Sequence, residues 1–70
     1  MAAKCVPLLI QNLHHENESV RDESTRMLGA FGTNAASALQ PLMSLEMTDG
    51  SSHVRAAAKE AIAEIKPGKS

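Results

Sequence analysis

The feature that most limits how this chain can fold is an internal repeat. One pattern occurs twice, and the second copy follows the first after 34 residues without a gap. A period of this length is typical of proteins built from stacked repeats. Proline within the first helical stretch is uncommon in a helix, so its return at the same phase supports a true repeat. The corresponding positions are Pro7 with Pro41, Leu8 with Leu42, Val20 with Val54, Arg21 with Arg55, Leu28 with Ile62, and Phe31 with Ile65.

Composition limits the size and type of the core. Seventy residues allow one small domain, which we place at residues 1–70. Hydrophobic residues make up 43% of the chain, but only 1% are aromatic, so the core has to be built from aliphatic side chains and alanine. No stretch alternates between apolar and polar residues as a strand would, so the composition favours closely packed helices.

Charge and cysteine content exclude several classes of function. The net charge is −1 and the two signs are interspersed, so the chain lacks the basic patch expected for nucleic acid or an anionic membrane. Cys5 is the single cysteine and lies in an apolar run, where we expect a small core residue in a reducing compartment. With no signal peptide or long apolar span, the sequence predicts a cytoplasmic protein.

The first repeat predicts two helices. Val6, Leu9, Ile10 and Leu13 are spaced for one face of a helix over about residues 3–13. This helix either begins near Val6 or starts at Ala3 and bends at Pro7, and we favour the bend.

After the polar break at residues 14–17, Asn17 or Ser19 caps the second helix. Gly32 follows that helix as the residue that ends it in a left-handed conformation. The predicted buried stripe is Val20, Ser24, Met27, Leu28 and Phe31.

The second repeat predicts another pair. Thr33 or Asn34 caps the third helix, and the chain breaks at residues 49–52, where Ser52 is a candidate N-cap. The fourth helix runs to about Lys66, before Pro67. The predicted apolar face of the third helix is Leu39, Leu42, Met43 and Met47, and that of the fourth is Val54, Ala58, Ala61, Ile62 and Ile65.

These residues together resemble the HEAT-repeat pattern, most closely the short bacterial, bilin-lyase-like HEAT repeats. That pattern has a proline in its first helix, an aspartate near the end of that helix, and Val-Arg opening the second. Asp49 and Arg55 match the aspartate and arginine of the second unit, whereas His15 stands where the first unit would carry its aspartate. The structural repeat motif is therefore Pro7, Val20, Arg21, Pro41, Asp49, Val54 and Arg55.

The resemblance implies an all-α fold of two antiparallel helical hairpins, stacked as a short right-handed α-solenoid. Repeat one spans about residues 3–32, repeat two about residues 34–66, and residues 67–70 form a tail. Because about three repeats are usually needed to cover the apolar flanks, two repeats leave both flanks open. We therefore expect a non-catalytic protein-interaction module that self-associates as a homo-oligomer or belongs to a longer array. The alternative is an accessory subunit or fragment of a bilin-lyase-like protein.

No set of residues predicts catalysis, a cofactor or a metal site. His14 and His15 lack the helical spacing of a zinc motif, and stacking could bring His53 near His15, but a solvated loop is the favoured interpretation. The end of the chain, residues 68–70, lacks the strand and helix of a phosphate-binding loop. Asn17-Glu18-Ser19 fits an N-glycosylation sequon but is more simply a helix start.

The exposed side of the second helices is the remaining candidate surface. In proteins of the resembled type these helices line the concave face, which usually binds the partner. The predicted partner-binding residues are Glu23, Arg26, Ala57, Glu60 and Glu64. The alternative is a plain solvated face with charge pairs such as Asp22 with Arg26.

Overall fold

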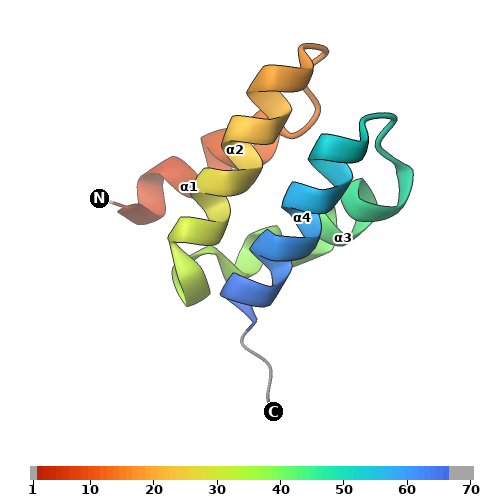
Figure 1. The fold of residues 1–70 in the computed structure, drawn as a ribbon. Coiled ribbons are helices and arrows are strands. Elements are labelled where there is room, and N and C mark those ends of the chain that lie inside the picture. Colours follow the sequence, from red (N-terminus) through yellow and green to blue (C-terminus); the bar gives the residue numbers. More distant parts are fainter. Residues whose placement is uncertain (1, 67–70) are drawn as a thin grey trace.

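The computed structural model describes residues 2–66, which form four α-helices and one 3₁₀-helix, with no strand among them (Figure 1). The predicted all-α fold is confirmed. In Figure 1, α1 and α2 form one antiparallel hairpin and α3 and α4 form another, and α2 packs against α4. The elements are α1 (Ala2–Asn12), α2 (Glu18–Ala30), η1 (Gly32–Ala38), α3 (Leu39–Thr48) and α4 (Ser52–Ile65).

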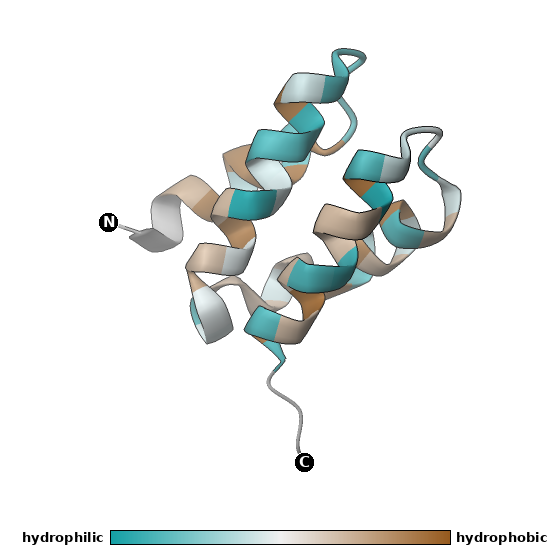
Figure 2. Cartoon of the chain, in the orientation of Figure 1, coloured by the Kyte–Doolittle hydropathy of each residue, from teal (hydrophilic) through white to brown (hydrophobic). Residues whose placement is uncertain are grey.

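The core lies between the helices and is built from aliphatic side chains and alanine. Leu28, Leu42 and Val54 are completely buried, and the single aromatic residue, Phe31, is half-buried against them. Alanines at four core positions allow the helices to approach closely, which is how a chain nearly free of aromatic residues fills its interior. Figure 2 shows that the faces of α2 and α4 directed away from this core are largely hydrophilic. The core alanines are Ala35, Ala38, Ala58 and Ala61.

Side-chain caps start the second helix of each hairpin. Asn17 caps α2, because its Oδ1 accepts a hydrogen bond from the backbone N–H of Ser19 at 2.8 Å. Ser51 caps α4, because its Oγ accepts from the backbone N–H of Val54 at 3.3 Å. Ser52 was the expected cap of α4, and that prediction is wrong because Ser52 already lies within the helix.

Helix α1 begins earlier than one alternative required. It starts at Ala2 and continues through Pro7, so a start near Val6 is wrong. The helix directs Val6 and Leu9 into the core, which leaves the neighbouring Cys5 exposed. The prediction of a buried structural thiol is therefore wrong.

The connection between the hairpins also differs from the prediction. Gly32 has φ of 61°, the left-handed conformation expected of a residue that ends a helix. Thr33 and Asn34 do not cap the third helix, because they lie inside η1. The segment kinks at Ala35, which has φ of −105° and ψ of 26°. Ala35 and Ala38 are buried, and α3 begins only at Leu39.

The methionines expected in the core lie on the surface. Met27 is 45% exposed, Met43 48% and Met47 80%. Because α2 packs against both α1 and α4, its buried surface instead takes in Thr25 and Gly29. In α3 the inward positions are Leu42 and Leu45, which turns the methionines outward.

Candidate functional site: a groove between the second helices and the junction beside it

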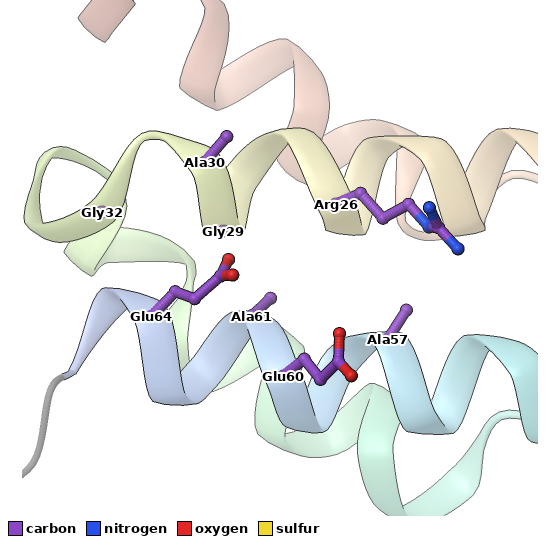
Figure 3. A pocket seen from close by; sticks show the side chains of 8 residues that line it. All are labelled: Arg26, Gly29, Ala30, Gly32, Ala57, Glu60, Ala61 and Glu64. Carbon is purple, nitrogen blue, oxygen red and sulfur yellow. The ribbon is translucent and has the colours of Figure 1, made fainter.

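A groove of about 600 Å³ lies between α2 and α4, the second helices of the two hairpins (Figure 3). Its walls come from the end of α2, the following glycine and the middle of α4. Figure 3 shows the labelled side chains of α4 on the side of that helix that faces α2. The lining residues are Arg26, Gly29, Ala30, Gly32, Ala57, Glu60, Ala61 and Glu64.

Small residues set the depth of the groove. A Cβ atom placed on Gly29 would lie 3.0 Å from Cα of Ala61 and would also collide with the carboxylate of Glu64. Helices α2 and α4 therefore approach so closely at this point that only glycine fits. Gly29 and Ala61 are both buried and line the groove where the two helices are in contact.

Four of the five predicted partner-binding residues line this groove. Arg26 extends from α2, while Ala57, Glu60 and Glu64 come from α4 (Figure 3). Glu23 is exposed on α2 but does not line the groove.

Sequence reasoning missed the small lining residues Gly29, Ala30, Gly32 and Ala61. The only signal for them was their size, which by itself does not distinguish a groove from a helix contact.

The charges of the groove are unequal. Arg26 is the one cation among the residues that line the groove. Its Nε lies 3.5 Å from Oδ1 of Asp22 on the same helix, which is the charge pair predicted from the sequence. Glu60 and Glu64 oppose it with two carboxylates on α4. The groove therefore has an excess of negative charge.

A network of hydrogen bonds beside the groove joins the two hairpins. Arg21 binds the carboxylate of Asp49 with two parallel contacts, from Nε to Oδ2 at 2.8 Å and from Nη2 to Oδ1 at 3.1 Å. Nη1 of Arg21 also donates to the backbone carbonyls of His15 and Glu16, at 2.8 and 3.1 Å. Such a bidentate pair fixes orientation as well as distance, so Arg21 locks the first inter-helix turn onto the second.

Asp49 is the centre of the second turn. Its Oδ1 accepts a hydrogen bond from the backbone N–H of Ser51 at 2.9 Å, and its carbonyl accepts one from Nη1 of Arg55 at 2.7 Å. Burial raises the pKa of Asp49, but the hydrogen bonds from Ser51 and Arg21 and the charges of Arg21 and Arg55 outweigh it, so that the pKa lies below its ordinary value. Ser51 adds a link between the hairpins, donating to Oε2 of Glu18 at 2.7 Å.

The sequence shows which motif residues of the two repeats are equivalent, and the structure shows where each of them lies. Pro7 lies in α1 and Pro41 near the start of α3. Val54 is completely buried, whereas Val20 is half-buried.

Residues 2–66 contain no group of three or more His, Cys, Asp or Glu residues placed to hold a metal ion. His14, His15 and His53 are each exposed in or beside the turns. In the same part of the chain, no helix has the length and apolar character needed to cross a membrane.

Comparison with protein families identifies the family to which the chain belongs. The family model for HEAT repeats matches residues 3–70, and the chain therefore belongs to the HEAT-repeat family. Members of this family generally mediate protein–protein interactions as non-catalytic scaffolds. Comparisons with curated proteins and with solved structures give no match.

Proposed function

We propose that this protein is a non-catalytic protein–protein interaction module whose groove between α2 and α4 binds an extended segment of a partner protein. The observation that carries the proposal is the lining of the groove, where Glu60 and Glu64 rise beside a floor of small residues. The charged side chains of this lining, Arg26, Glu60 and Glu64, can form ion pairs and hydrogen bonds with a partner chain.

The chemistry of the groove selects for a basic segment. The charge of Arg26 is partly opposed by Asp22, whereas Glu60 and Glu64 make no ion pair in the described part of the chain. Lysine or arginine side chains of a partner would find two carboxylates, and the small residues would let the partner backbone approach α2 and α4. Charge complementarity of this kind sets specificity and the rate of association.

The experiment is a titration with two fluorescently labelled peptides, one alternating lysine with alanine and the other alternating glutamate with alanine. We expect anisotropy to report binding of the lysine peptide only. Glu60→Lys should weaken that binding by about tenfold or more, because it reverses a charge at the groove. Glu16→Lys is the matched control, since it makes the same change of net charge at an exposed turn position. Equal binding of both peptides, or equal effects of both variants, would contradict the proposal.

We also propose that residues 3–32 and 34–66 act as two repeats of one domain spanning residues 1–70, with residues 67–70 outside the described part. Both flanks of this pair expose large apolar side chains: Leu8 is 63% exposed on α1 and Met47 80% on α3. Surfaces of this kind favour contact with more protein, supplied by a second copy or by further repeats.

The accessory role in a bilin-lyase-like protein stays a prediction. A spectral titration of the chain with a bilin tests it, and the absence of any spectral shift would contradict it.

A further inference from the structure

The second inter-helix turn contains a dipeptide with covalent chemistry of its own. Asp49-Gly50 is the only place in the sequence where glycine follows an aspartate or an asparagine. Glycine has no Cβ atom to hinder its own backbone nitrogen, so that nitrogen can reach the side-chain carboxyl of the preceding residue. A Cβ atom built on Gly50 meets nothing within 4 Å, so the surrounding structure leaves room for this approach. The turn is therefore suited to the rearrangement of aspartate to isoaspartate.

This rearrangement needs only water and leaves the composition of the chain unchanged. The backbone nitrogen of Gly50 attacks Cγ of the neutral Asp49 carboxyl, the N–Cγ bond forms, and the carboxyl hydroxyl leaves as water with the proton of the nitrogen. Water then opens the cyclic succinimide that results. If the bond from the nitrogen to Cγ breaks, aspartate is restored. If the bond from the nitrogen to the main-chain carbonyl carbon breaks, the chain continues through Cγ as isoaspartate.

The contact between the hairpins holds the Asp49 carboxyl in the ionised form, which does not react. Nε of Arg21 donates to Oδ2 at 2.8 Å, and Oδ1 accepts from Nη2 of Arg21 at 3.1 Å and from the backbone N–H of Ser51 at 2.9 Å. Donors occupy both oxygens, so neither carries the proton that would allow it to leave as water. The Asp49 side chain is only 5% exposed, so this arrangement is also shielded from solvent.

We propose that Asp49-Gly50 is a modification site controlled by the hairpin contact: Arg21 prevents isoaspartate formation while the hairpins are joined, and their separation permits it. Arg21 belongs to the first hairpin, so each opening of the junction removes two of the donors that occupy the carboxylate. Isoaspartate carries its carboxylate directly on Cα and has an extra carbon in the main chain. It therefore cannot restore the bidentate contact, and the junction stays open after the modification.

Incubation of the whole chain in neutral buffer for several weeks tests the proposal. A protein isoaspartyl methyltransferase with radiolabelled S-adenosylmethionine measures the isoaspartate formed, and electron-transfer fragmentation of the Asp49 peptide locates it. Arg21→Gln should raise the rate of formation about fivefold or more, because that rate follows the population of chains with an open junction. Leu9→Ala is the matched control, since it destabilises the core from α1 and leaves the contact of Arg21 with Asp49 in place. Urea unfolding of both variants establishes how closely their stabilities match.

Two further measurements separate the chemistry from the fold. The parent chain in guanidinium chloride gives the rate without protection. Gly50→Ala fits the turn because its Cβ atom meets no neighbour, and it should lower that unprotected rate about fivefold or more by hindering the nitrogen. The isoaspartate form, separated by reversed-phase chromatography, should unfold at a lower urea concentration than the parent chain.

Three results would overturn the proposal. The first is equal rates for Arg21→Gln and Leu9→Ala at matched stability, because protection would then come from the fold as a whole. The second is isoaspartate forming as fast in the folded parent chain as in guanidinium chloride. The third is an isoaspartate form as stable as the parent chain, because the junction would then have closed again.

Discussion

The two inter-helix turns are equivalent in the repeat, and each is held by a side chain that accepts a backbone hydrogen bond, but the two side chains differ. In each, a side chain accepts the backbone N–H two residues on: Nδ1 of His15 from Asn17 at 3.0 Å, and Oδ1 of Asp49 from Ser51 at 2.9 Å. In each, an arginine Nη1 binds the carbonyl of that residue, at 2.8 and 2.7 Å. Only Asp49 also binds an arginine of the other hairpin.

This difference separates two tasks that a turn residue can perform. An imidazole is enough to shape the turn, because shaping requires one acceptor. Of the two turn residues, only Asp49 has the second acceptor atom and the negative charge that pair with an arginine of the other hairpin. Within residues 2–66, Arg21 is therefore paired with a carboxylate of the other hairpin, whereas Arg55 forms no ion pair.

The largest expected effect comes from replacing each turn residue with alanine. Asp49→Ala should lower the free energy of unfolding by about 3 kcal/mol, because it leaves the guanidinium of Arg21 without its partner in a largely buried contact. His15→Ala removes one exposed hydrogen bond and should cost about 1 kcal/mol or less. Urea unfolding followed by circular dichroism measures both, and equal losses would contradict the distinction between the turns.

The comparison extends to the helices through Gly29 and Ala63, which are equivalent in the repeat. Gly29→Val should cost about 2 kcal/mol, because its Cβ atom would press against the backbone of Ala61 and separate α2 from α4. Ala63→Val lies on the exposed side of α4 and should change stability by only about 0.5 kcal/mol. Thermal unfolding distinguishes the two, and a destabilising Ala63→Val would mean that the flank beyond α4 is already covered.

Much of the fold follows from the sequence, because apolar spacing and turn residues act locally. The helical stripes, the left-handed Gly32 and the cap at Asn17 depend on residues close in the chain. The wrong predictions concern residues whose burial depends on a contact between the two hairpins. Met27 was expected in the core, but α4 covers the side of α2 that carries Thr25 and Gly29.

The site was predictable in part for the same reason. Arg26, Glu60 and Glu64 could be named in advance because helical spacing places them on the exposed side of the second helices, and the resemblance to HEAT repeats singles out that side. The pairing of Arg21 with Asp49 joins residues 28 positions apart, and the alignment of repeats identified both residues without showing that they meet. Ala61 was predicted only as an inward residue of the fourth helix, and Gly29 was not predicted, because the small size of a residue does not show which helix packs against it.

A smaller effect is expected at the helix caps. Asn17→Ala and Ser51→Ala should each cost about 1 kcal/mol, since each removes an acceptor for an unpaired N–H at a helix start. Ser51→Ala should cost more of the two, because Ser51 also donates to Glu18 across the junction. A double-mutant cycle with Glu18→Ala measures that coupling, and a coupling of zero would show that the link contributes nothing.

The smallest effect is confined to acid. Because the folded-state pKa of Asp49 is lowered, its contribution is present above the unfolded pKa of about 4 and is lost as pH falls through the folded value. Asp49→Asn keeps an acceptor for Ser51 but has no charge to titrate, so its unfolding free energy should fall less steeply below about pH 4. Parallel acid profiles for both chains would contradict this assignment.

The central claim is that one arginine position of the repeat is paired and the other is open. Urea unfolding of Arg21→Ala and Arg55→Ala tests it most directly, since the two substitutions are chemically identical and differ only in repeat. We expect a loss of about 2 to 3 kcal/mol for Arg21→Ala, which strands the carboxylate of Asp49, and about 1 kcal/mol or less for Arg55→Ala, which removes a single hydrogen bond. Equal losses, or a larger loss at Arg55, would contradict the account.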